Sequence, residues 1–335
     1  MATTKSPLKG LSALVTGGSR GLGLLIAREL ASRGCRLLIC ARDADELRRA
    51  EEELRATGAE VHSTVADLTD AATPERLVAE AQERFGHVDI LVNNAGIIQV
   101  GPMETMTERD FREAMELMFF AQLRMVLAVL PGMRSRGTGR IVNITSIGGR
   151  IAVPHLLPYS AAKFAATGFS DGLRAELAPT GISVTTVIPG LMRTGSHFAA
   201  RFGGNAEQEY AWFATGAGMP LLSMNAGRAA RAIVRAAERR RPEIILTPAA
   251  KAAVRLHGVA PVTAVRMLSL VDRLLPSSGN GTGPVQTVSG VQACERLNSR
   301  LVDRVTALAN RAARHNNEPV PARLGRWSVP VKEGK

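Results

Sequence analysis

Three side chains that can hold or transfer a proton stand close together in the middle of the chain. Tyr159 and Lys163 are four residues apart, and Ser146 precedes the tyrosine by thirteen residues. Positions i and i+4 of a helix share one face, so the ammonium group can favour the ionised phenol and lower its pKa. Such a tyrosine is a candidate general acid or base. For this pair alone, a surface tyrosine beside a salt-bridging lysine is the more common structure.

A glycine-rich segment near the N-terminus has the pattern of a phosphate-binding turn. It follows a short apolar run and reads Thr-Gly-Gly-Ser-Arg-Gly-Leu-Gly over residues 16–23. Between a strand and a helix, the free N–H groups and the positive end of the helix dipole can bind a pyrophosphate. An ordinary tight turn is the alternative for the segment alone. The candidate cofactor-binding residues here are Thr16, Gly17, Ser19, Arg20, Gly21, Leu22 and Gly23.

Apolar runs alternate with helical periodicity over the first 247 residues. The pattern predicts strands at 11–16, 36–40, 60–65, 90–92, 139–144, 182–188 and 243–247. It predicts helices at 22–32, 44–57, 74–85, 111–133, 159–178 and 226–239. This alternation is typical of an α/β fold with a doubly wound parallel sheet, here of about seven strands. The irregular residues 191–225 should then lie beyond the carboxyl end of a strand, where such sheets bind ligands.

The character of the chain changes after the last predicted strand. Two amphipathic stretches, 261–275 and 291–314, flank a segment rich in glycine and serine at 276–290. We therefore predict a catalytic domain at 1–247, a helical C-terminal extension at 248–315 with a linker at 276–290, and a flexible tail at 316–335.

Arginines mark the place where the adenosine ribose of a dinucleotide would lie. Arg42 directly follows the second predicted strand, where a site that prefers NAD usually has a carboxylate, and Arg20 is near it. Two cations favour a 2′-phosphate, and therefore NADP(H) over NAD(H). Asp43 weakens that preference, and a solvent-exposed arginine is the alternative for Arg42. Asp67, after the third strand, is a candidate for the adenine edge and equally for a helix cap.

The composition excludes several classes of protein. The three cysteines have no spacing that suggests a disulfide framework or a zinc site, and we expect no metal. The first ten residues lack the apolar core of a signal peptide, and we expect no membrane span, so the sequence predicts a cytoplasmic protein. Of the net charge of +12, residues 241–335 contribute +8, from 14 Lys and Arg against 6 Asp and Glu. These cations follow helical patterns without an aromatic platform, so no nucleic-acid partner is expected.

Together, these motifs resemble those of the classical short-chain dehydrogenases/reductases, over about residues 8–247. The matching segments are the glycine turn at 16–23, Asn-Asn-Ala-Gly at 93–96, Ser146, Tyr-Ser-Ala-Ala-Lys at 159–163, and Pro-Gly at 189–190 with Thr194. The resemblance implies a Rossmann-type fold, a nicotinamide cofactor and a catalytic set of Ser146, Tyr159 and Lys163. It also implies that Asn93, Ala95 and Gly96 line the adenosine side of the cofactor. Pro189, Gly190 and Thr194 would line its nicotinamide end, together with Tyr159 and Lys163.

One position departs from the family pattern. Members usually carry an asparagine thirteen residues before the proline that corresponds to Pro131, and this chain has Met118 there. The asparagine supports a water that supplies protons to the lysine, whereas methionine offers only a weak sulfur acceptor. The proton relay is therefore expected to be rerouted, slowed or absent.

We expect an NADP(H)-dependent oxidoreductase that transfers hydride reversibly between nicotinamide and a carbonyl or secondary alcohol, with Tyr159 as general acid and base. Apolar residues suggest a hydrophobic small-molecule substrate: Leu156, Leu157, Met192, Phe198, Phe202, Trp212 and Phe213. The alternative, motivated by Met118 and the basic extension, is a catalytically weakened protein that binds the cofactor or a partner.

Residues 261–275 carry one apolar face, including Val262, Val265 and Val271. The face either covers the protein's own apolar surface or contacts an anionic membrane peripherally. By the family resemblance, the helices at 111–133 and 159–178 are expected to form contacts in a homo-oligomer, which the tail could obstruct.

Overall fold

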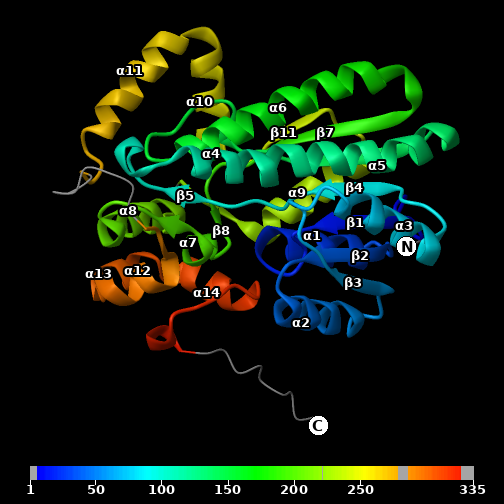
Figure 1. The fold of residues 1–335 in the computed structure, drawn as a ribbon, viewed down its shortest axis with the longest axis horizontal. Coiled ribbons are helices and arrows are strands. Elements are labelled where there is room, and N and C mark those ends of the chain that lie inside the picture. The colour runs from blue at the N-terminus through cyan, green and yellow to red at the C-terminus, as the bar shows by residue number, and fades with distance from the viewer. Residues whose placement is uncertain (1–5, 221, 278–285, 326–335) are drawn as a thin grey trace, which may run out of the picture.

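The computed structural model describes residues 6–220, 222–277 and 286–325, and its centre is a parallel sheet of seven strands (Figure 1). The strand order is β11-β7-β6-β4-β1-β2-β3, so the chain winds outward in both directions from β1 and β4. The strands are β1 (Ser12–Thr16), β2 (Arg36–Ala41), β3 (Val61–Val65), β4 (Ile90–Asn93), β6 (Gly139–Ile144), β7 (Ile182–Ile188) and β11 (Glu243–Ile245). The predicted fold class is confirmed.

Helices cover both faces of this sheet (Figure 1). One face packs against α1 (Gly21–Ser32), α2 (Ala44–Arg55) and α9 (Ala226–Glu238); the other packs against α3 (Thr73–Phe85), α5 (Ala121–Arg136) and α6 (Leu157–Leu177). Successive strand residues point to opposite faces. In β1, Ala13 and Val15 accordingly enter the first core, whereas Leu14 enters the second.

The helix predicted at 111–133 is longer and contains an irregular turn. It runs through α4 (Glu108–Met115), a π-helical segment (Glu116–Phe120) and α5. Its most apolar window has a mean hydropathy of 1.5, so by length and composition the helix from 108 to 136 could cross a membrane. In the fold, Met125, Val129 and Met133 of α5 are buried against the sheet, as in the core helix of a globular protein.

A smaller layer lies beyond the carboxyl edge of the sheet and has its own core. It contains two small sheets, of β8 (Met192–Arg193) with β10 (Met224–Asn225), and of β5 (Gln99–Val100) with β9 (Arg201–Phe202) and β12 (Val288–Ser289). Its helices are α7 (Ser196–Ala199), α8 (Ala206–Gly218), α12 (Gly290–Leu297), α13 (Arg300–Val305) and α14 (Ala307–His315). Phe198, Phe202 and Tyr210 pack there against Cys294 and Ala313. The extension therefore shares a core with residues 198–214, and the predicted domain division stays a prediction.

The C-terminal region differs from its predicted form in three respects. The stretch 291–314 is three short helices, because Asn298 ends α12 in the left-handed conformation and Thr306 ends α13. The predicted linker already forms strand β12 at its end, while residues 278–285 lie outside the described residues. The tail predicted as flexible is in hydrogen-bonded contact with the fold at residues 316–318, and its residues 326–335 lie outside the described part.

Helices α10 (Pro248–Val259) and α11 (Pro261–Asp272) form a hairpin that projects from the molecule (Figure 1). Val262 is 64% exposed, and Val265 and Val271 are about half exposed. The expected covering of the protein's own surface by this face is therefore not found, because α11 packs mainly on α10 and buries only Ala264.

Candidate active site

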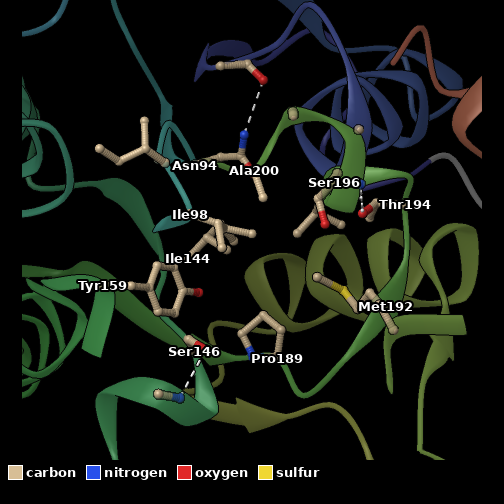
Figure 2. Close-up of a pocket in the computed structure, with 18 of the residues that line it drawn as sticks. Asn94, Ile98, Ile144, Ser146, Tyr159, Pro189, Met192, Thr194, Ser196 and Ala200 are labelled. Carbon is tan, nitrogen blue, oxygen red and sulfur yellow. Dashed lines mark hydrogen bonds between the residues drawn. The ribbon is translucent and has the colours of Figure 1, made fainter. Parts of the chain in front are cut away.

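Ser146, Tyr159 and Lys163 come together at the carboxyl end of β6. Ser146 follows the strand, and its hydroxyl accepts a hydrogen bond of 3.0 Å from the Gly148 N–H. Tyr159 and Lys163 lie one turn apart on α6, and the Lys163 ammonium donates to the Ile144 carbonyl at 2.8 Å. Figure 2 shows the phenol of Tyr159 beside the Ser146 hydroxyl. The three groups could bind one carbonyl oxygen and exchange a proton with it.

Burial, rather than the lysine, dominates the pKa of the tyrosine. Burial raises the pKa of Tyr159, and the Ser146 hydroxyl opposes this only in part. The ammonium group of Lys163 lies 5.8 Å from the centre of the tyrosine ring and is directed to the Ile144 carbonyl. Burial also lowers the pKa of Lys163 to about 8. The expected lowering of the tyrosine pKa by Lys163 is thus not found, and the neutral phenol is the favoured form.

The glycine turn is shaped to bring backbone close to a ligand. Gly17 and Gly21 have φ of 63° and 57°, a region that favours glycine, and a side chain on Gly23 would overlap the Gly17 carbonyl. Asn94 braces the turn, because its amide donates to the carbonyls of Thr16 and Gly17 at 3.1 Å. We did not predict Asn94 as a site residue, although its place in the Asn-Asn-Ala-Gly segment was a signal for it.

A single cavity of about 980 Å³ joins the glycine turn to the three catalytic candidates. Most of the predicted residues line it: Gly17, Ser19, Arg20, Gly21, Leu22, Arg42, Ala95, Gly96, Ser146, Tyr159, Lys163, Pro189, Gly190 and Thr194. Thr16, Gly23, Asn93 and Asp67 do not. Thr16 and Gly23 support the glycine turn without lining the cavity. Gly23 lets α1 pack closely against the Gly17 carbonyl, and the Thr16 hydroxyl accepts from the Asn94 N–H at 2.9 Å.

Asn93 and Asp67 have other partners in the structure. The Asn93 amide donates to Asn143 at 2.9 Å inside the sheet, so its side chain does not reach the cavity. Asp67 accepts from both the N–H and the hydroxyl of Thr69, and the Thr69 N–H holds the pKa of Asp67 low despite its partial burial. These bonds form a local turn, and the N-cap of α3 is Ala72, so Asp67 is found neither at the cavity nor as a helix cap. Ala66 and Leu68 form the cavity wall there.

The two arginines predicted to bind a 2′-phosphate differ in their surroundings. Arg42 lines the cavity at the end of β2. Arg20 also lines it but forms ion pairs with Glu46 at 2.6 Å and Glu318 at 3.4 Å. Two carboxylates thus already neutralise Arg20, and neither Glu46 nor Glu318 was predicted as part of the site.

Met118 occupies the position of the usual asparagine and faces the catalytic helix. It lies in the π-helical segment, is 2% exposed, and packs against Ala162 and Tyr159. Its sulfur would lie 3.4 Å from a side chain on Gly96. Among the described residues, the Lys163 ammonium donates its hydrogen bond to the Ile144 carbonyl. The methionine therefore places apolar atoms where a polar proton relay was expected.

The far end of the cavity is apolar. Val153, Leu156, Met192, Trp212, Phe213 and Leu222 line it, together with Ala249, Ala250 and Ala253 of α10. Phe198 and Phe202, which we predicted for this pocket, are instead fully buried in the core of the smaller layer. Leu157 also does not line the cavity.

The residues present fit a dinucleotide. The cradle of Gly17 and Gly21 would be blocked by side chains, and the N-terminal end of α1 offers N–H donors and a positive dipole to a diphosphate. Ala66 and Leu68 offer an apolar slot for an aromatic base, and Lys163 lies near the other end.

Known proteins are similar to this chain in sequence and in fold. A family model described as short chain dehydrogenase matches residues 12–201. A Streptomyces coelicolor protein named as a ketoacyl reductase is 43% identical over 196 residues, which are 58% of this chain and 74% of that protein. A dehydrogenase/reductase SDR family protein 7-like from Anopheles gambiae is 35% identical and matches over 76% of this chain and 80% of its own length.

Two solved structures extend the similarity to the fold. A short-chain dehydrogenase from Streptomyces avermitilis has a TM-score of 0.67 and 32% identity, with 78% of this chain and 98% of that chain covered. A metagenomic short-chain oxidoreductase in complex with NADP has a TM-score of 0.59 and 27% identity, with 72% and 98% covered. The chain therefore belongs to the short-chain dehydrogenase/reductase family of NAD(P)-binding oxidoreductases.

Proposed function

We propose that the protein is an NADP(H)-dependent reductase of a carbonyl group in a hydrophobic substrate, and in reverse an alcohol dehydrogenase. One observation carries this proposal. A single cavity joins a dinucleotide cradle, the set of Ser146, Tyr159 and Lys163, and an apolar end. A carbonyl compound bound in the apolar end could therefore contact both the catalytic set and a cofactor in the cradle.

The residues divide the chemistry between them. A bound nicotinamide supplies or accepts the hydride. The Tyr159 hydroxyl donates its proton to the carbonyl oxygen, and its raised pKa keeps that proton in place until charge develops on the oxygen. Ser146 donates a hydrogen bond to the same oxygen and stabilises its negative charge. Lys163, whose ammonium group lies 5.8 Å from the centre of the Tyr159 ring, supports the return of a proton to Tyr159. These roles favour the direction of reduction.

The preference for NADP(H) is supported by Arg42, because this residue lines the cavity at the end of β2, where a 2′-phosphate would lie. The NADP complex of a structural neighbour agrees with this preference. For the substrate, the apolar wall and the names of the ketoacyl reductase relatives support a ketone or aldehyde on a lipid-like or polyketide-like chain.

The test is turnover of NADPH with a panel of aldehydes, ketones and ketoacyl thioesters. Tyr159→Phe should lose about 10²- to 10⁴-fold in kcat with every accepted substrate, because the proton donor is gone. The matched control is Tyr210→Phe, at the only other tyrosine, whose ring is buried in the core of the smaller layer. Full turnover by Tyr159→Phe would exclude this mechanism.

A catalytically weakened cofactor-binding protein is the second candidate, because Met118 puts apolar atoms beside Lys163 and Tyr159. It predicts cofactor binding without turnover on the whole panel. Measurable reduction that depends on Tyr159 would exclude it.

We also propose a cytoplasmic protein that contacts anionic membranes peripherally through α10 and α11. Residues 248–275 expose apolar side chains and carry four Lys and Arg against one Asp, a net charge of +3. Flotation of the full chain with anionic vesicles should fall in Val265→Glu. Leu301→Glu changes an exposed leucine on α13 and should leave flotation unchanged. Equal flotation of all three proteins would exclude this contact.

A homo-oligomer through α5 and α6 is a further proposal. Leu127 on α5 is 57% exposed, and Phe120 and Phe164 are about 40% exposed. Light scattering should give a dimer or tetramer for the protein and a smaller species for Leu127→Glu. A monomeric wild-type protein at micromolar concentration would contradict the proposal.

A further inference from the structure

The end of the described chain crosses the predicted diphosphate site. Residues 316–318 follow α14 and lie against the N-terminal end of α1 and the nearby α2, about 300 residues away in sequence; Figure 1 shows α14 beside α2. The Gly21 N–H donates to the Asn316 carbonyl at 2.8 Å. The Asn316 amide donates to the Thr194 carbonyl at 3.1 Å. We call residues 316–318 the strap, because they join the two walls between which a diphosphate would bind.

Asn317 fixes the strap in a specific seat. Its amide nitrogen donates at 2.8 Å to the carbonyls of both Ser19 and Glu46, and its oxygen accepts from Arg49 at 2.8 Å. Its φ of 56° is in the left-handed region, which asparagine tolerates better than most residues. Every polar group of this side chain is thus used. Asn317 does not line the cavity, so it would not touch a bound cofactor.

Glu318 carries a carboxylate into the cavity itself. Its side chain is 5% exposed, and one of its oxygens lies 2.6 Å from the position of a side chain on Gly21. The other oxygen has no hydrogen-bond partner among the described residues, although Arg20 lies 3.4 Å from it. The carboxylate therefore lies against the helix end that attracts anions.

A diphosphate and this carboxylate would need the same space and the same positive field. When Glu318 is ionised both are anions, and Arg20, which pairs with Glu318, is already paired with Glu46. Bringing like charges together in a site with little water is unfavourable.

We propose that the strap competes with the dinucleotide for the N-terminal end of α1. Glu318, which lines the cavity, and Asn317, which anchors the strap, weaken cofactor affinity by holding the strap closed. This inference rests on the nucleotide site of the proposed function but needs neither its substrate nor its chemistry. When the strap leaves, Arg20 also loses one of its two carboxylate partners and becomes a better ligand for phosphate.

The test measures binding of NADPH and NADH to the full chain without substrate. If the strap is closed in about nine of ten molecules, its release strengthens apparent affinity about tenfold. Asn317→Ala and Glu318→Ala should therefore each lower both dissociation constants about tenfold, measured near pH 6.5. The control Asn298→Ala removes another asparagine of the extension with positive φ, one that does not line the cavity, and should change neither constant. Unchanged or weaker binding in the two strap variants would overturn the proposal.

A second measurement does not depend on affinity. Saturating NADPH should speed hydrogen exchange of peptides that cover residues 316–325, because the cofactor displaces the strap. Slower exchange would show instead that the strap closes over the cofactor, and would also overturn the proposal. If the strap variants bind more tightly and NADPH speeds exchange as expected, but no substrate is turned over, only the proposed reaction would be contradicted.

Discussion

The strap should open as the pH rises, because its carboxyl group is held in an environment that disfavours charge. Burial raises the pKa of Glu318 to about 7, the nearby Glu46 contributes to the rise, and Arg20 opposes it. In an open strap the group would return to its ordinary value of 4.5. The closed state therefore binds a proton that the open state releases, so closure is fully favoured below pH 4.5 and weakens until about pH 7.

The size of this effect follows from the two pKa values. The difference is 7 − 4.5, or about 2.5 units, which corresponds to about 3 kcal/mol at roughly 1.4 kcal/mol per unit. Solvent screening reduces it little, because the side chain is only 5% exposed. A change of about 3 kcal/mol moves the equilibrium between closed and open strap by about two orders of magnitude.

The assay is an equilibrium titration with NADPH between pH 5 and 8, in the wild type and in Glu318→Gln. Glutamine is neutral at every pH and should hold the strap closed as the protonated acid does. The ratio of the two dissociation constants removes the titration of the cofactor's own phosphates. Wild type and variant should bind equally near pH 5, and the wild type should bind at least about tenfold more tightly by pH 8. A ratio that does not change with pH would refute the reasoning.

Three further predictions concern the catalytic centre and the cofactor. Met118→Asn should raise kcat about tenfold, because it restores a polar proton relay, and should lower the free energy of unfolding by about 1–3 kcal/mol, because it buries an amide. The control Met118→Leu should change neither quantity in parallel turnover and denaturation measurements. Lys163→Met should abolish turnover but raise Tm by about 2–4 °C at pH 7. Burial lowers the pKa of Lys163 to about 8, so at pH 7 the folded wild type holds a buried cation that costs stability and that methionine removes. This gain should shrink from pH 8 to 10.5, where the wild type itself becomes more stable; an unchanged Tm throughout would count against the buried charge. Arg42→Ala should weaken NADPH binding about tenfold and leave NADH binding unchanged, and equal losses for both would argue against a 2′-phosphate site.

The sheet and the catalytic centre could be predicted from sequence because local patterns determine both. Alternating periodicity gives parallel strands with right-handed crossovers, and the carboxyl ends of those strands then lie at one edge. Ser146 and the pair on α6 meet at that edge, as the family resemblance implied from the order and spacing of the motifs. The roles of individual residues at the cavity wall were harder to predict from the sequence. Residues in a strand alternate between faces, so Asn93 shares the face of Leu91, which α5 covers, and its amide donates to Asn143. Asn94, the next residue, supports the glycine turn instead.

The C-terminal extension could not be predicted at this level, because its structure depends on a surface that the rest of the chain builds. Each of its three helices after residue 289 is short and gains little from propensity alone. Their breaks follow single positions such as Asn298, which ends α12 in the left-handed conformation. What fixes them is burial of Ala293, Cys294 and Ala313 against α7, α8 and β9.

The strap illustrates the same dependence at a functional site. By composition, residues 316–318 are typical of a polar tail, since each of the three side chains is hydrophilic and none could form a core. Their order comes from the partner surface instead. The first turn of any α-helix leaves N–H groups without partners in the helix, and a site shaped for an anion concentrates them in a small space. The Asn316 carbonyl accepts a hydrogen bond from the Gly21 N–H, as an oxygen of a diphosphate would. A segment that binds because it imitates the ligand must also be displaced by the ligand, and this links the order of the tail to cofactor affinity.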